Sequence, residues 1–138
     1  MAWRCPDCGR SFGRRGQWHS CRPAVALEDW LSTRPPQVRD ILVAVRAHVE
    51  TLGGDVLLEP TRDAVMIKRA RTFAEVKPRR GRTEVALVLP RRLPDRRVVR
   101  TLDLTRDRIV HVVDVADAAD VDEQLRAWLT EAYGSSPA

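Results

Sequence analysis

The chain has 138 residues, 43% of them hydrophobic, which is enough for one domain with a single core and a small appendage. No run of about 18 uncharged apolar residues occurs, so we expect no membrane-spanning segment. The N-terminal residues lack an apolar stretch of signal-peptide length, and all three cysteines precede residue 22. These features predict a cytoplasmic protein rather than one held together by disulfides.

The formal net charge of +5 is unevenly distributed along the chain. Residues 68–108 carry 14 basic and 5 acidic side chains, residues 1–22 are also basic, and residues 109–138 are acidic. Such asymmetry favours a polyanionic partner. Of the 24 basic residues 22 are arginine, beside abundant alanine and valine, so a GC-rich genome explains the same excess. Both interpretations stay open.

The first 21 residues contain the ligands of a metal site. Cys5-Pro-Asp-Cys8-Gly is a knuckle, in which two thiolates two residues apart chelate one ion. His19 and Cys21 complete a Cys₃His set, the closed shell of one structural zinc ion per chain. Only one residue separates His19 from Cys21, which is shorter than usual in zinc fingers, so one of these two is the less secure ligand. A redox pair of Cys5 and Cys8 is the alternative, although no βαβ pattern surrounds them.

Four protein ligands leave no coordination position for a substrate, so the ion is expected to be structural rather than catalytic. Trp3, Phe12 and Trp18 flank the ligands. We expect them to form the small core of the knuckle, because so short a segment folds only around its ion. Stacking of these rings on a nucleobase is the functional alternative.

Two helical segments are predicted after the linker Arg22-Pro23-Ala24. The first is a single turn over residues 27–31, and the second begins at the prolines Pro35-Pro36 and runs to about Leu52. Gly53-Gly54 is expected to end it. Its apolar stripe consists of Val38, Ile41, Leu42, Val45, Val49 and Leu52.

Short apolar runs then predict strands over residues 55–58, 64–68, 72–76, 83–89, 97–102 and 108–113. The run over residues 83–89 alternates best, with Val85, Leu87 and Leu89 on one face. The basic segment from Lys77 to Arg82 contains a proline and a glycine, so it is predicted to be the turn before this strand.

A last helix is expected to begin at a cap provided by Asp120 and Glu123 and to end at Gly134. The order of elements predicts an α+β fold: helix, antiparallel sheet of about five or six strands, and helix, with both helices on one face. We expect a zinc knuckle over residues 1–22, an α+β domain over residues 23–134 and a frayed tail over residues 135–138.

Several of these residues also resemble a known family. The start of the chain resembles bacterial proteins carrying the "domain of unknown function 5655" in the runs Trp3-x-Cys-Pro-x-Cys-Gly-Arg-x-Phe and Gln17-x-His-Ser-Cys. Later parts of the chain resemble the same family in the stretch from Pro60-Thr61 to Phe73-Ala74, in Leu89-Pro-Arg-Arg and in Leu125-x-x-Trp-Leu-x-x-Ala-Tyr. The resemblance covers nearly the whole chain. It implies a compact α+β domain, distantly similar to YdhG and frataxin-like domains, and no established activity.

The main domain offers no candidate for catalysis, since it has no cysteine, no Gly-x-Ser-x-Gly and no P-loop pattern. His48 is expected to be an exposed histidine without a role, and His111 a structural or surface histidine; hydrolysis stays open without a candidate residue. Frataxin-like iron handling would use an acidic surface, but a helix N-terminus explains the acidic group Asp114, Asp117, Asp120, Asp122 and Glu123.

The preferred hypothesis is therefore a non-enzymatic module that binds nucleic acid or another polyanion. The arginines expected to contact phosphates are Arg14, Arg15, Arg79, Arg80, Arg82, Arg91, Arg92, Arg96 and Arg97. A protein-interaction or adaptor domain with a structural zinc ion is the main alternative. Metal handling and small-molecule binding are the others.

Overall fold

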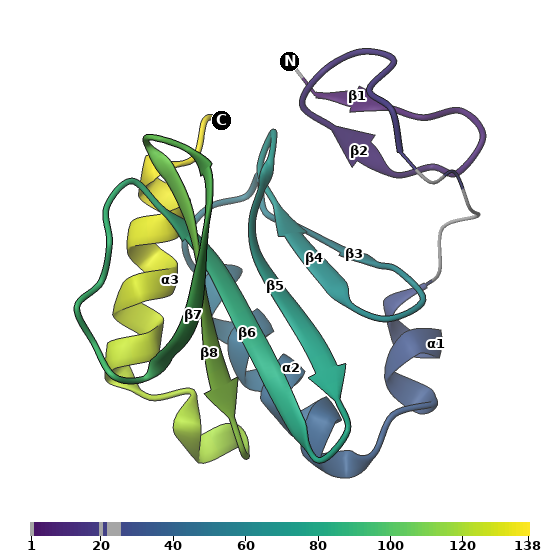
Figure 1. Cartoon of the computed structure of the whole chain (residues 1–138). Helices are drawn as coiled ribbons and strands as arrows, with labels where there is room; N and C mark the ends of the chain where they lie inside the picture. Colours follow the sequence, from purple (N-terminus) through teal and green to yellow (C-terminus); the bar gives the residue numbers. More distant parts are fainter. Residues whose placement is uncertain (1, 20, 22–25) are drawn as a thin grey trace.

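Six antiparallel strands form the centre of the fold in a computed structural model that describes residues 2–19, 21 and 26–138 (Figure 1). The predicted linker over residues 22–24 lies outside the described residues. In chain order the elements are β1 (Trp3–Arg4), β2 (Ser11–Phe12), α1 (Leu27–Ser32), α2 (Pro36–Val49), β3 (Leu57–Pro60), β4 (Val65–Lys68), β5 (Thr72–Arg79), β6 (Arg82–Leu89), β7 (Val98–Thr105), β8 (Arg108–Val115), the 3₁₀ turn η1 (Ala118–Asp120) and α3 (Glu123–Ser135).

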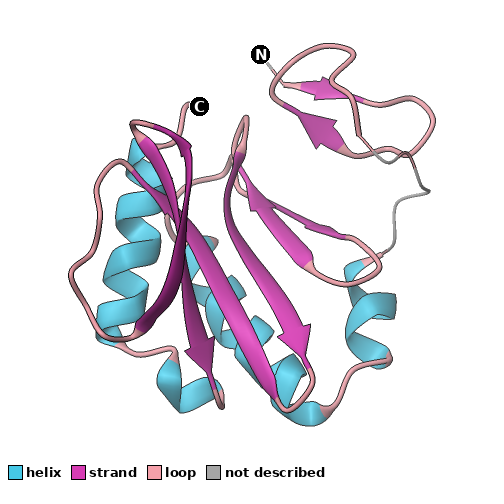
Figure 2. Ribbon diagram, in the orientation of Figure 1, coloured by secondary structure: helices cyan, strands magenta, loops and turns pink. Residues whose placement is uncertain are grey.

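The sheet has the order β3-β4-β5-β6-β8-β7, and every neighbouring pair is antiparallel. The long helices α2 and α3 both lie on one side of it, as Figure 2 shows. The predicted α+β class with an antiparallel sheet is therefore confirmed. None of the helices in the described part of the chain has the length and apolar character that crossing a membrane requires.

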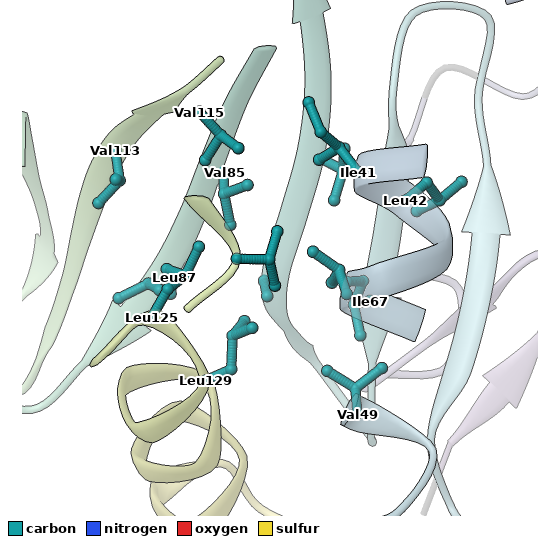
Figure 3. Packing of buried hydrophobic residues seen from close by; sticks show 14 of the residues in the cluster. Ile41, Leu42, Val49, Ile67, Val85, Leu87, Val113, Val115, Leu125 and Leu129 are labelled. Atoms are coloured by element: carbon teal, nitrogen blue, oxygen red, sulfur yellow. The ribbon is translucent and has the colours of Figure 1, made fainter. Parts of the chain in front are cut away.

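The core fills the space between the sheet and these two helices (Figure 3). The strand register places one row of valines across four strands, because Val65 pairs with Val76, Val76 with Val85 and Val85 with Val113. All four valines are fully buried. The predicted stripe of α2 packs against them, and so does α3 through residues such as Leu125 and Leu129. Alternation along β4, β5, β6 and β8 thus places these four valines on the side of the helical layer.

The opposite face of the sheet carries a buried carboxylate. Glu84 is only 3% exposed, and its oxygens accept hydrogen bonds from Arg79 and Arg100. Hydrogen bonds from Arg100 outweigh the cost of burial and, with those from Arg79, lower the pKa of Glu84 to about 2. Arg82 adds a further positive charge 3.7 Å from the same carboxylate.

The predicted turn from Lys77 to Arg82 is wrong in extent. β5 continues through Pro78 to Arg79, and the turn consists only of Arg80 and Gly81, whose φ is 79°. A proline fits there because the pairing of β4 with β5 ends at Val76, so no strand needs the missing N–H on that side. Arg79 and Arg82 are therefore strand residues near Glu84, rather than turn residues that are free to contact a ligand.

The predicted cap of the last helix is also displaced. Asp122 caps α3 by accepting from the backbone N–H of Leu125, whereas Asp120 belongs to the capping box of η1 together with Asp117. Closely spaced aspartates offer several competing caps, and a 3₁₀ turn uses the first two. The helix also continues through Gly134 to Ser135. Within the predicted tail, the carbonyl of Ser136 accepts from Arg69, and that of Pro137 accepts from the N–H of Ala70.

Candidate metal centre and adjoining cleft

A two-stranded hairpin and a tight turn bring the cysteines of the N-terminal segment together. β1 pairs with β2, so Trp3 lies opposite Phe12. Between them, the N–H of Gly9 donates to the carbonyl of Cys5 at 2.8 Å, and the N–H of Cys5 donates to the carbonyl of Arg10 at 2.9 Å. Gly9 adopts a φ of 75°, a conformation that favours glycine. The local sequence therefore closes the loop that presents Cys5 and Cys8.

The four predicted ligands meet at one point. Atoms of Cys5, Cys8, His19 and Cys21 all lie within 4.8 Å of one another. Sγ of Cys5 lies 3.7 Å from Sγ of Cys21, and Sγ of Cys8 lies 3.4 Å from Nε2 of His19. All three cysteines are free thiols, since a disulfide needs sulfur atoms about 2.05 Å apart. This Cys₃His group can hold a metal ion, and it is the only such group found among the described residues.

The surroundings shift the pKa values of Cys8 and Cys21 in opposite directions. Burial favours the neutral form of Cys8, but hydrogen bonds from the backbone and side chain of Arg10, with those from Cys5 and His19, lower its pKa to about 6. Burial and the hydrogen bonds with Cys5 and Cys8 raise the pKa of Cys21 to about 11. Three thiols packed this closely cannot all ionise without strong repulsion between the thiolates. A divalent cation compensates that negative charge by binding the thiolates.

A second layer of contacts orients the imidazole of His19. Nδ1 of His19 lies 2.7 Å from the carbonyl oxygen of Gln17, which directs Nε2 toward the cysteines. The ring stacks on Phe12 at a centroid distance of 4.1 Å and meets Trp3 edge-on. Trp3 and Phe12 therefore form the expected small core of the knuckle. Trp18 differs from them, because it is 86% exposed.

The knuckle docks on the edge of the main sheet through a buried ion pair. Nζ of Lys68 in β4 lies 2.9 Å from Oε1 of Glu59 in β3, and their side chains are only 7% and 13% exposed. Both partners also bind the backbone of Ser11 in β2: Lys68 donates to its carbonyl at 2.6 Å, and Glu59 accepts from its N–H at 2.9 Å. Sequence reasoning missed this contact, because nothing local relates Ser11 to residues 59 and 68.

A cleft of about 620 Å³ opens where the knuckle meets the sheet. Its walls include Phe12, Arg14 and Trp18 of the knuckle and Lys68, Arg71 and Arg108 of the sheet domain. None of the described residues that line it is acidic. The cleft therefore concentrates positive charge beside two aromatic rings.

Two arginines of the sheet domain that line the cleft have no carboxylate partner in the described part of the chain. Arg71 and Arg108 have no ion-pair partner among the described residues. Burial, and then the positive charge of Arg71, lower the pKa of Arg108. Lys68, in contrast, is already paired with Glu59. Arg71 and Arg108 lay outside the predicted arginines, since only the chain topology brings the β4–β5 turn and the start of β8 together.

Most of the arginines predicted to contact phosphates have carboxylate partners. Arg79 pairs with Glu84, Arg82 with Glu84 and Asp114, Arg91 with Glu131, Arg92 with Asp103 and Arg97 with Asp122. The remaining four, Arg14, Arg15, Arg80 and Arg96, are exposed and have no ion-pair partner in the described part of the chain. Of the nine, only Arg14 lines the cleft. Eight of the 14 basic residues in the range 68–108 have a carboxylate partner among the described residues, so part of the basic excess is balanced in space.

The two histidines of the main domain have structural contacts. His111 is fully buried, its Nε2 accepts from the N–H of Leu93, and its Nδ1 lies 2.9 Å from the carbonyl of Ile109. Nε2 of His48 lies 2.9 Å from Oγ1 of Thr130, which joins α2 to α3. His48 was expected to be exposed and without a role, and the contact with Thr130 shows that this expectation is wrong.

The comparison with protein families gives a match over most of the chain. The sequence model of a family described as "Domain of unknown function (DUF5655)" matches residues 27–136. No curated protein and no solved structure matches the chain. The Cys₃His group lies on the N-terminal side of the matched residues.

Proposed function

The chain belongs to the family described as a domain of unknown function (DUF5655), and we propose from its own residues that it is a non-enzymatic module that binds nucleic acid. In this proposal, a structural zinc ion bound by Cys5, Cys8, His19 and Cys21 holds the knuckle in shape. The knuckle and the sheet together form the cleft that receives the phosphates. The observation that carries the proposal is the unbalanced positive charge of this cleft.

Zinc is supported by the ligand set and its spacing. Bonds of about 2.3 Å to sulfur and 2.1 Å to nitrogen in a tetrahedral site separate two sulfurs by about 3.8 Å, and a sulfur from a nitrogen by about 3.6 Å. The corresponding distances here are 3.7 Å for Cys5 with Cys21 and 3.4 Å for Cys8 with His19. Bound zinc would stabilise the fold of a segment that has almost no core of its own.

Phosphate binding is supported by the chemistry of the cleft. Arg14, Arg71 and Arg108 supply guanidinium groups, which match phosphate oxygens in a bidentate geometry. A phosphate between Arg71 and Arg108 would also relieve their mutual repulsion. The paired arginines elsewhere on the surface would contribute less, because contact with a phosphate has to compete with their carboxylates.

A matched pair of double variants tests the proposal. Arg71→Gln with Arg108→Gln removes two cleft charges, and Arg91→Gln with Arg92→Gln removes two charges that are paired with Glu131 and Asp103. Both variants have the same net charge, so only position distinguishes them. Binding of a fluorescent single-stranded oligonucleotide is measured by anisotropy at several salt concentrations.

The cleft variant is expected to flatten the slope of log affinity against log salt by about 1.4, or about 0.7 for each lost phosphate contact. The control variant should keep a slope close to that of the wild type. Equal slopes for all three proteins would contradict the proposal and would favour arginine content set by genomic composition.

A protein-interaction role is the second candidate, and one observation favours it. β7 is an edge strand of the sheet, and its Val99, Leu102 and Leu104 are 51%, 61% and 48% exposed. An open edge with apolar side chains is a site where another chain can add a strand. A partner that is retained at high salt and lost on substitution of Leu102 would support this function instead.

A further inference from the structure

The most exposed aromatic side chain of the described residues lies in the cleft. Trp18 is 86% exposed, whereas Trp30 and Trp128 are 2% and 8% exposed, and Trp3 packs near Phe12 and His19. A single exposed apolar residue needs no explanation on its own. Trp18 has a second property, however: it shares a cleft with Arg14, Arg71 and Arg108. It also directly precedes His19, so a bound metal would hold the backbone of Trp18 in place.

We propose that the cleft binds an unpaired nucleic-acid strand, with one base stacked on Trp18 and the adjoining phosphates bound by Arg71 and Arg108. The inference rests on the proposed function and adds the class of nucleic acid. A cationic groove beside an accessible aromatic ring is the arrangement by which proteins bind single strands without reading their sequence. Phosphates satisfy the arginines, and any base can stack on the indole.

A double helix fits this site less well for two reasons. The bases of a duplex expose only their edges, so their faces cannot reach an indole unless they leave the stack. The cleft volume of about 620 Å³ is that of pockets enclosing one small molecule, about 300–1,000 Å³. It therefore accommodates one or two nucleotides and excludes a double helix from its interior.

Three probes of equal length separate the contributions of bases and phosphates. They are an oligothymidylate, an abasic strand with the same phosphates, and a duplex. Binding to the zinc-loaded full-length protein is measured by anisotropy and by quenching of intrinsic tryptophan fluorescence. The wild type is expected to bind oligothymidylate about 5- to 150-fold more tightly than the abasic strand, the range that stacking of one base provides.

Substitution of Trp18 assigns this difference to the indole. Trp18→Ala is expected to remove the preference for the base-bearing strand and to leave affinity for the abasic strand unchanged. Trp18→Phe should retain part of the preference, because phenylalanine can still stack on a base. Zinc content should be unchanged in both variants, which would show that the knuckle is still folded. Oligouridylate in place of oligothymidylate shows whether the strand bound is RNA or DNA.

The outcomes separate this inference from the proposed function. Equal affinity for the abasic and base-bearing strands, with a normal salt slope, would overturn base stacking while leaving phosphate binding intact. Tighter binding of the duplex would overturn the assignment to unpaired strands. No binding of any probe, or equal binding of polyglutamate, would overturn both proposals.

Discussion

Replacement of Lys68 by methionine tests how the knuckle is attached to the sheet. Methionine keeps much of the volume of lysine and removes its charge, so Glu59 loses its partner in a site where its side chain is 13% exposed. The variant also removes the 2.6 Å hydrogen bond to the carbonyl of Ser11. The knuckle and the sheet domain should therefore separate more easily.

The size of the effect depends on whether the knuckle is folded. Breaking a buried ion pair typically costs about 3–5 kcal/mol, and the two hydrogen bonds that Glu59 keeps with the N–H of Ser11 reduce this to about 2–4 kcal/mol. Without metal the knuckle is expected to unfold, which exposes the pair to water. An exposed pair contributes about 0–1 kcal/mol, so the same substitution should then have little effect.

Urea unfolding of the zinc-loaded and chelated proteins measures both values. With zinc, Lys68→Met should lower the midpoint of urea unfolding by about 0.7 to 4 M, given a slope of about 1–3 kcal/mol/M. After chelation, the two proteins should differ by less than about 1 kcal/mol. Lys77→Met, which changes the only other lysine, is the control. An equal loss of stability in both conditions would contradict a role in docking the knuckle, because the pair would then act within the sheet alone.

Three further predictions concern protonation and metal content. Glu84, with a pKa of about 2, stabilises the fold fully above pH 4.5, and about 3 kcal/mol is lost as the pH falls toward 2. Acid unfolding of Glu84→Gln should lack this loss and start from lower stability at pH 7. Burial lowers the pKa of His111, so stability should fall as the pH drops below about 6.5. His111→Leu should remove that dependence in thermal melts while destabilising the protein, because the N–H of Leu93 loses its acceptor. Cys5→Ser should abolish binding of one zinc ion per chain, and stoichiometric iron in the wild type would contradict the zinc assignment.

The main elements could be predicted because their signals are local. The stripe of α2 and the alternation of β6 depend on residues within one element, and both patterns point to the same core. The ends of elements were less predictable. Pro78 indicated a turn by its chemistry, but the length of the neighbouring strand β4 decides whether its missing N–H matters. That length is a property of the sheet, so residues 77–82 alone could not reveal it.

The Cys₃His group could be predicted for the same reason, since all four residues lie within 17 consecutive positions. The positive charge of the cleft could not be predicted. It depends on which arginines lack a carboxylate partner, and such partners can be far away in the sequence: Glu131, the partner of Arg91, lies 40 positions from it. Clusters of arginine in the sequence therefore overstated the available charge, while the isolated Arg71 and Arg108 gave no local signal.

The most direct test of the account compares oligothymidylate binding by the zinc-loaded protein and by the same protein after chelation. The knuckle supplies Arg14 and Trp18 to the cleft, so its loss removes one wall together with the stacking surface. Chelation is expected to lower affinity at least about fivefold, given stacking worth about 1–3 kcal/mol, and added zinc is expected to restore it. Unchanged affinity in the chelated protein would contradict the claim that a metal-ordered knuckle forms the binding site.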